Sequence, residues 1–336
     1  MIGRDMFKFN ISMISLRWRI VLAFAAVYLI WGSTYLAIRF AIETIPPYLM
    51  GGARFLIAGS VLYAVLRWRG VKTPTRLNWR AAAIAGGLLL WGGNGGVMLA
   101  EQYVPSSLAA LIVAMVPLWM VLLNWRWGDR ARPNAGTALG VGLGLVGIVL
   151  IAAPGQAAAE GAVNPIGLLI LIGASLSWSI GSLYSRKAAL PSNALLSTAM
   201  EMLAGGGMML MAGLLLGQGA QIRFDQISVL SLSALGYLVV LGSLIGFTAY
   251  VWLLKVSTPA RVSTYAFVNP VVAVFLGWAF AGEELSLRVM AAAAVIIVAV
   301  MLITLNQTTR PARAEPAREV VEVSPRVQYE SVTSNE

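Results

Sequence analysis

The chain has 336 residues, of which 59% are hydrophobic and 11% charged, and its net charge is +10 at pH 7. A soluble domain of this composition would lack the polar residues needed to cover its surface, so we expect lipid to be the main solvent. The absence of cysteine and histidine excludes disulfides, thiolate chemistry and imidazole-bound metal.

Ten apolar segments are long enough to cross a bilayer, since about 20 helical residues span about 30 Å of hydrocarbon. The continuously apolar run 291–300 differs from the alternating pattern of a β-barrel strand, so the sequence predicts an all-α integral membrane protein. The first segment follows Arg17 and Arg19 without a convincing cleavage site, so we expect it to remain uncleaved. In chain order the segments are 20–42, 48–67, 81–100, 106–123, 134–152, 165–184, 195–217, 230–253, 260–281 and 287–305.

The loops between these segments alternate between rich and poor in Lys and Arg. Basic residues concentrate before the first segment, in every second loop and after the tenth, whereas the other loops hold only Arg223 and Arg288. The positive-inside rule therefore predicts that both termini are cytoplasmic. Because the basic excess follows the topology, we expect no nucleic-acid partner.

The two ends of the chain differ in composition from the apolar segments. Residues 1–19 are basic and partly amphipathic, which predicts a cytoplasmic N-terminal segment that orients the first span. Residues 306–336 are polar and mix prolines with Arg and Glu, which predicts a disordered cytoplasmic tail.

The two halves of the apolar region resemble each other. Trp31, Arg39 and Arg54 have the same mutual spacings as Trp178, Arg186 and Glu201, and a proline recurs in the fourth and ninth segments. We therefore expect two five-helix repeats, over residues 20–152 and 165–305. Because five is odd, the second repeat would enter the membrane from the opposite side, giving ten transmembrane helices as two inverted repeats.

Several short motifs in this order resemble the EamA branch of the drug/metabolite transporter superfamily. This resemblance covers about residues 20–305 and implies a ten-helix exporter of small metabolites, without naming the cargo. The motifs are Ile30-Trp31-Gly32-Ser33-Thr34-Tyr35, Arg54-Phe55-Leu56, Gly93-Asn94-Gly95, Glu201-Met202-Leu203, Tyr265-Ala266-Phe267-Val268-Asn269-Pro270 and Gly282-Glu283-Glu284.

Charged residues at membrane depth are costly and must face protein or water. We expect Arg186 to pair with Glu201, and Glu43 or Glu101 to pair with Arg54 and Arg39. One interpretation is that such pairs only fix the arrangement of the helices, and another is that Glu201 couples transport to protons. The intramembrane charges are Arg39, Arg54, Glu101, Arg186 and Glu201.

Candidate residues for a substrate cavity come from four spans. Trp91, Asn94, Met98 and Glu101 have helical spacing beside a run of glycines, and the alternative is a small-residue seam between helices. Aromatic and hydroxyl groups would make a largely apolar cavity, although tryptophan is also common at membrane interfaces. The remaining candidates are Trp31, Tyr35, Trp178, Ser182, Tyr265 and Asn269.

Pro117 and Pro270 lie inside the fourth and ninth segments. A proline removes a backbone donor and clashes with the preceding turn, so both helices are expected to kink. Kinks at equivalent places would suit hinges, and static bends that improve helix contacts are the alternative.

No phosphate-binding loop and no hydrolase or protease motif is present, so we expect neither an enzyme nor direct use of ATP, and no cofactor. A channel would normally show rings of like residues or a filter loop around an oligomeric pore, whereas this chain carries its own two-fold repeat, so a channel is not favoured. We predict an inner-membrane secondary transporter that exports small metabolites, amino acids or amphipathic drugs by alternating access. Its partners would be the substrate, membrane lipid and, as one option, protons, and the alternative function is a flippase for lipid-linked head groups.

Overall fold

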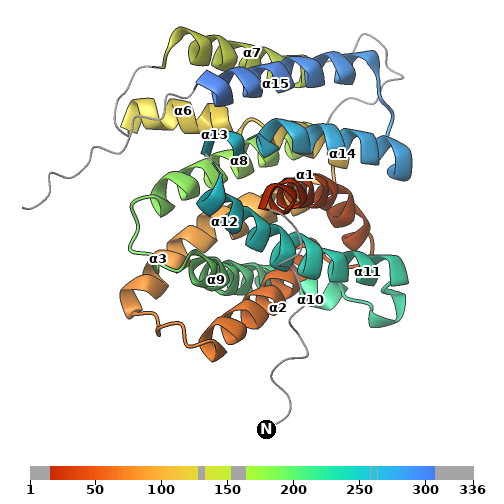
Figure 1. Ribbon diagram of the computed structural model, residues 1–336. Coiled ribbons are helices and arrows are strands. Elements are labelled where there is room, and N and C mark those ends of the chain that lie inside the picture. Colours follow the sequence, from red (N-terminus) through yellow and green to blue (C-terminus); the bar gives the residue numbers. More distant parts are fainter. Residues whose placement is uncertain (1–15, 128–132, 153–163, 258, 263, 307–336) are drawn as a thin grey trace, which may run out of the picture. The chain divides into compact units, whose positions relative to one another are not determined.

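The computed structural model describes residues 16–127, 133–152, 164–257, 259–262 and 264–306. Every regular element in these ranges is a helix (Figure 1). Most of the predicted N-terminal segment and nearly all of the predicted tail lie outside them. In chain order the elements are α1 (Leu16–Ala41), α2 (Pro47–Trp68), α3 (Arg76–Gly86), η2 (Gly87–Asn94), α4 (Gly95–Ala100), α5 (Ser106–Val113), α6 (Val116–Trp127), α7 (Ala135–Ala152), α8 (Pro165–Ser185), α9 (Ala194–Leu215), α10 (Gln218–Gln221), η3 (Phe224–Gln226), α11 (Val229–Tyr237), η4 (Leu238–Ile245), α12 (Gly246–Val256), α13 (Pro259–Val262), α14 (Tyr265–Ala281) and α15 (Leu287–Asn306).

Eight helical stretches in the described part of the chain are long and apolar enough to cross a membrane. Two shorter apolar helices, Ala135–Leu150 and Tyr265–Ala281, coincide with the fifth and ninth predicted segments. The all-α prediction is therefore confirmed over the described ranges. The eight long stretches are Leu16–Ala41, Pro47–Trp68, Arg76–Ala100, Ser106–Arg126, Pro165–Ser185, Ala194–Leu215, Val229–Val256 and Leu287–Asn306.

The third and eighth predicted spans each contain a π-helical segment between two α-helical parts. η2 joins α3 to α4, and η4 joins α11 to α12. Both segments contain eight residues and are followed by a glycine, Gly95 or Gly246. Both spans also begin after a hydroxyl cap, because Thr75 accepts from the backbone of Asn78 and Ser228 from that of Ser231. π-Helical segments are rare overall, but those that occur are often located at functional sites. These two segments are therefore candidate functional regions.

The two predicted hinge prolines occupy different positions. Pro270 lies inside α14, as the sequence predicts. The fourth span is instead broken between α5 and α6, and Pro117 is the second residue of α6. A proline in the first helical turn loses no intrahelical hydrogen bond. The break at Ala114 and Met115 lies in the turn before Pro117, where the sequence predicts a kink, so an interruption of the fourth span is confirmed at this place. The role of the two prolines as hinges stays a prediction.

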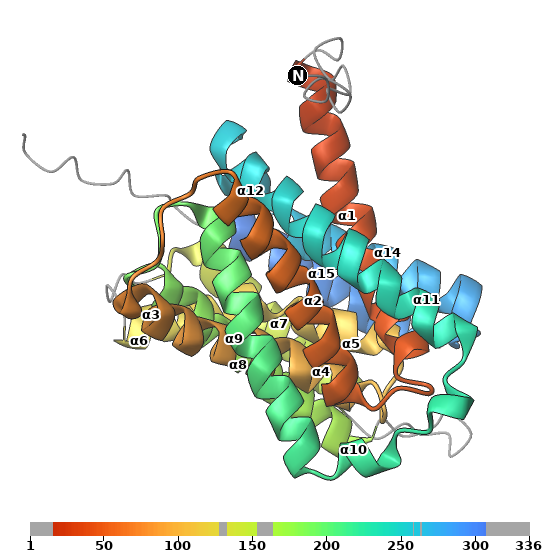
Figure 2. The same cartoon turned by 90° about the horizontal axis from the view of Figure 1, so that it is seen from below.

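Two pairs of equivalent helices run antiparallel along each other. α2 and α9 lie side by side (Figure 2), and the backbone N–H of Tyr48, near the start of α2, donates to Gln218 Oε1 just after α9 at 3.1 Å. α7 and α15 lie side by side (Figure 1). Arg288 Nε donates to the Leu150 carbonyl at 2.7 Å, and Asn134 Nδ2 donates to the Asn306 carbonyl at 2.7 Å. The beginning of each of these helices therefore meets the end of its partner.

The remaining contacts between the halves are reciprocal. α1 contacts α11, η4 and α12 of the eighth span and α14 of the ninth. Its equivalent, α8, contacts α3, η2 and α4 of the third span and α5 and α6 of the fourth. Each helix thus meets the same members of the opposite half that its equivalent meets, which is the contact pattern of a two-fold arrangement.

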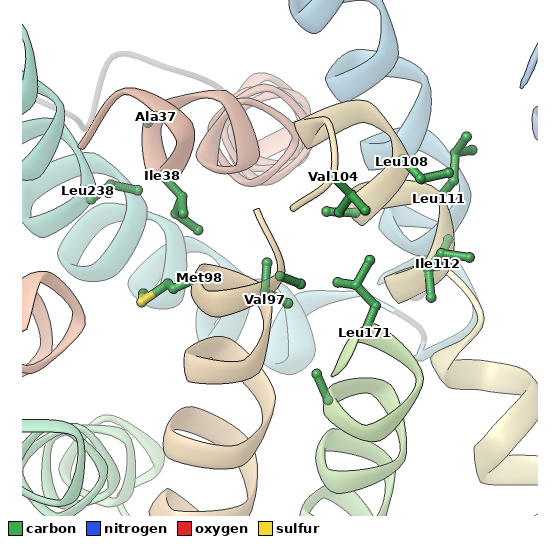
Figure 3. Close-up of a cluster of buried hydrophobic side chains, with 14 of the residues drawn as sticks. Ala37, Ile38, Val97, Met98, Val104, Leu108, Leu111, Ile112, Leu171 and Leu238 are labelled. Carbon is green, nitrogen blue, oxygen red and sulfur yellow. The ribbon is translucent and has the colours of Figure 1, made fainter. Parts of the chain in front are cut away.

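One hydrophobic core joins the two halves. Figure 3 shows labelled side chains from α1, α4, α5, α8 and η4 gathered in one cluster. Met98 is fully buried there, and a Cβ added to Gly51 of α2 would lie 2.6 Å from its sulfur. The centre between the halves is therefore occupied by packed side chains in this conformation.

Candidate functional site

An aromatic cluster surrounds Trp31 of α1. The centroid of its ring lies 5.2 Å from that of Phe247, 5.1 Å from that of Tyr250 and 5.4 Å from that of Tyr265. Trp31 Nε1 donates to the Gly242 carbonyl of η4 at 3.2 Å. The structure thus brings two of the predicted cavity residues, Trp31 and Tyr265, together beside the π-helical segment.

The equivalent helix of the other half makes a similar approach to η2. Trp178 of α8 lies so close to Gly93 that an added Cβ would be 2.8 Å from its ring, and the neighbouring Ser177 Oγ donates to the Leu88 carbonyl at 2.7 Å. Ser182 Oγ donates within its own helix, to the Trp178 carbonyl at 2.8 Å. Each π-helical segment therefore gives one carbonyl to a side chain of the helix that packs on it.

Tyr35 and Asn269 lie where α1 approaches α14. Tyr35 packs against the hydrophobic core, and Asn269 is 8% exposed with its Oδ1 buried and lacking a hydrogen-bond partner. A Cβ added to Gly32 would lie 2.6 Å from Val272 and 3.2 Å from the Asn269 carbonyl, so a glycine is needed for this approach. Buried amide oxygens are usually bonded, which keeps Asn269 a candidate for polar recognition.

The predicted stripe on the third span does not share one environment. Trp91 is 42% exposed, whereas Met98 and Glu101 are fully buried and Asn94 is half-buried. The spacing predicts a common face only for a continuous α-helix, but residues 87–94 are π-helical. Because a π-helical turn holds more residues, side chains before and after it no longer fall on a common face.

Arg39 and Arg54 have other partners than the predicted carboxylates. Arg39 is exposed, and its Nη1 donates to the backbone carbonyl of Glu101 at 3.0 Å. Arg54 is 3% exposed, its Nε donates to Ser243 Oγ at 3.0 Å, and its guanidinium lies 4.7 Å from the Phe55 ring centroid. The predicted ion pairs of Arg39 and Arg54 with Glu43 or Glu101 are therefore not formed.

Glu201 is also without its predicted partner. Its Oε1 accepts from Ser197 Oγ at 3.3 Å, one turn earlier in α9. Arg186 is exposed at the end of α8, and no ion pair joins it to Glu201 within the described ranges. The predicted pair of Glu201 with Arg186 is therefore not formed, and the hydroxyl of Ser197 takes the place of the arginine as a hydrogen-bond partner.

Glu283, which belongs to the Gly282-Glu283-Glu284 motif, makes a contact between distant parts of the chain that the sequence does not predict. Its Oε1 accepts from the Ser106 backbone N–H and hydroxyl, each at 2.7 Å, and its Oε2 accepts from the Ser107 backbone N–H at 3.0 Å. A carboxylate at a helix N-terminus satisfies free donors and the helix dipole. Glu283 therefore fastens the loop after α14 to the start of α5.

Two open grooves lie at the surface of the described helices. One, of about 510 Å³, lies between α1, α11 and α14 and includes Ser33 and Tyr237, whose hydroxyls are 2.5 Å apart. The other, of about 390 Å³, includes Leu244 and Trp252. Neither includes a predicted cavity residue, and the described ranges hold no group of three or more acidic side chains that could bind a metal.

These observations define a class of protein. The described chain is a set of apolar helices in two halves with equivalent π-helical segments and reciprocal contacts. Such a chain is a polytopic α-helical membrane protein.

The comparisons with known proteins name the family. Residues 18–153 and 165–305 each match the EamA-like transporter family, so the chain belongs to this family. It is 40% identical over 293 residues to the "Uncharacterized inner membrane transporter YedA" of Escherichia coli K12, covering 87% of this chain and 92% of that protein. It is 25% identical to the "Uncharacterized transporter YvbV" of Bacillus subtilis, covering 88% and 95%.

A solved crystal structure has the same fold. Its chain superposes with a TM-score of 0.58 at 22% sequence identity, covering 85% of this chain and 96% of that chain. The family prediction from the sequence motifs is thus confirmed, and the protein is a membrane transporter of the drug/metabolite type.

Proposed function

We propose that this chain is a secondary transporter of the bacterial inner membrane that exports small metabolites, amino acids or amphipathic drugs by alternating access. In this proposal ten helices cross the membrane as two inverted five-helix repeats, with both termini in the cytoplasm. The carrying observation is the reciprocal contact pattern, in which α1 and α8 meet equivalent helices of the opposite half. Two like halves of opposite sense can exchange conformations and so open a shared site to either face.

Several further features support this reading. The antiparallel pairs α2–α9 and α7–α15 are what inverted repeats require, since equivalent helices then cross in opposite senses. The related YedA of E. coli is named an inner membrane transporter. Trp31, Trp178, Tyr265 and Asn269 remain proposed cavity residues. Protons remain one option for the coupling ion, and facilitated diffusion is the other.

Transport by the purified full chain in proteoliposomes tests the proposal. Uptake of labelled amino acids and amphipathic drugs is measured with and without a pH gradient, with protein-free liposomes as control. We expect saturable movement of at least one class of solute. Movement of fluorescent phospholipid analogues without movement of any solute in the panel would replace the proposal by the flippase alternative.

A further inference from the structure

Arg54 is a buried cation with an unsatisfied donor. It is 3% exposed, its Nε donates to Ser243 Oγ, and its Nη1 is buried without a hydrogen-bond partner. No carboxylate lies within ion-pair distance of it among the described residues. The ring of Phe55, 4.7 Å from the guanidinium, supplies a cation–π contact but accepts no conventional hydrogen bond.

A buried guanidinium in this state is costly. An unpaired charge or unbonded donor removed from water loses several kcal/mol of solvation, which a single hydroxyl and a ring recover only in part. A planar fork of N–H donors is suited to binding both oxygens of a carboxylate. The presence of Arg54 in this environment is explained if an anionic group binds its guanidinium during the transport cycle.

Arg54 packs closely against a glycine of the π-helical segment η4. A Cβ added to Gly242 of η4 would lie 3.2 Å from Arg54 Nη2 and 3.2 Å from Thr34 Cγ2. The Gly242 carbonyl accepts from Trp31 Nε1. Side chains of α1 and α2 thus converge on one residue of a π-helical segment, the kind of irregular element that recurs at functional sites.

The same place offers an apolar surface. Trp31 contacts Gly242, and the rings of Phe247, Tyr250 and Tyr265 surround the Trp31 ring. Aromatic rings beside a cation complement a ligand with a carboxylate at one end and an apolar or aromatic body at the other.

From this geometry we infer that Arg54, with Ser243, is the receptor for a substrate carboxylate, and that the substrates are small carboxylates with an apolar or aromatic body. The inference rests on the proposed transport function and names its substrate class. In the structure Arg54 is enclosed by α1, α2 and η4, so binding requires a conformation in which α1 or η4 moves away from it.

The test compares a carboxylate with its neutral isostere in proteoliposomes. Labelled aromatic monocarboxylates and amino acids are paired with their amides and presented to wild type, Arg54→Gln, Arg54→Lys and a control, Arg223→Gln. Arg223 is exposed and lies beside Asp225 in a loop, so the control removes a cation away from the site. We expect wild type to prefer the acid, and Arg54→Gln to lower acid transport by about 10- to 100-fold with amide transport unchanged. Acid transport by Arg54→Lys should lie between that of wild type and that of Arg54→Gln, because lysine keeps the positive charge but lacks the paired N–H donors of the guanidinium.

A binding measurement separates this inference from the transport proposal. The melting temperature of the detergent-solubilised wild type should rise with the acid and not with its amide, because a ligand that binds only the folded state stabilises it. Wild type that moves acid and amide equally, or an Arg54→Gln variant that loses both equally, would overturn the inference. Absence of all transport, with the acid-specific rise in melting temperature intact, would overturn the transport proposal alone.

Discussion

Gly59 of α2 and Gly206 of α9 occupy equivalent positions in the two halves, and their contacts are equivalent too: Gly59 contacts Met202, and Gly206 contacts Phe55. A Cβ added to Gly59 would lie 2.9 Å from the Cβ of Met202, and one added to Gly206 would lie 3.0 Å from the Cβ of Phe55. Phe55 and Met202 are separated by 147 residues, as are the two glycines. The central crossing is thus the same contact made twice, in opposite senses, which is what the inverted-repeat proposal requires.

This contact predicts different effects for neighbouring glycines. Gly206→Ala forces a Cβ against the backbone and side chain of Phe55, so we expect a loss of about 1–3 kcal/mol of stability. Gly207→Ala is the matched control, because nothing lies within 4 Å of its added Cβ and alanine favours a helix. Thermal unfolding in detergent measures both. Equal melting temperatures for the two variants would contradict the close crossing.

Loss of the Glu283 carboxylate should free the start of α5. Glu283→Gln removes the charge and one of the two acceptor oxygens, so we expect a loss of about 1–2 kcal/mol. Glu284→Gln is the control, since Glu284 is exposed. Labelling of an introduced Ser107→Cys by a maleimide should become faster in the Glu283→Gln background. Unchanged labelling and stability would show that the contact with α5 does not hold this helix.

Glu101 predicts a pH-dependent stability. It lies just after the apolar span Arg76–Ala100, and both its carboxylate oxygens are buried without a hydrogen-bond partner. Burial, and then the Glu283 carboxylate, raise the pKa of Glu101 well above its ordinary value of 4.5, and Arg39 opposes them. Tyr35 of α1 also faces it. The folded state therefore holds a proton that the unfolded state releases.

The sign of the effect follows from that proton. Stability from Glu101 is fully present below the ordinary pKa and is lost as the pH rises through the raised one. The melting temperature of wild type should fall over this range, and that of Glu101→Gln should fall less. Glu43→Gln, at an exposed carboxylate, should keep the wild-type slope. Parallel slopes for all three proteins would refute the buried carboxyl as the cause.

The side-chain bond to η2 gives a further prediction. Ser177→Ala leaves the Leu88 carbonyl without the hydroxyl that approaches it from α8, which should cost about 1 kcal/mol. Ser182→Ala removes a hydroxyl that bonds only within α8 and should cost less. The difference between their melting temperatures isolates the contact between α8 and η2, and no difference would mean that this contact adds nothing to stability.

Much of the fold follows from the sequence because helix length and apolarity are set locally. Every predicted span coincides with helix in the described residues, and the family motifs identify the correct family. The π-helical segments were not predicted, since the choice between i+4 and i+5 bonding depends on the helices that pack against Gly242 and Leu88. The prediction that Trp91 and Met98 share one helix face was wrong for this reason.

Side-chain partners were predicted least well. Arg54 finds Ser243, far along the chain, and Glu283 finds Ser106 across a similar distance. Charge alone suggested carboxylates for Arg54, but the register of α2 against η4 decides its partner, and a single sequence does not contain that register. The Gly-Glu-Glu motif after the ninth span was the available signal for Glu283, and it names no partner.

The opposed orientation of the two halves is tested most directly by cysteine labelling in cells. The natural chain has no cysteine, so Leu150→Cys and Leu305→Cys each introduce a single thiol. Leu150 lies near the end of α7 and Leu305 near the end of the equivalent α15, which runs antiparallel to it. A membrane-impermeant maleimide should label Leu150→Cys in intact cells, and Leu305→Cys only after permeabilisation. Labelling of both positions from the same side would contradict the inverted repeat.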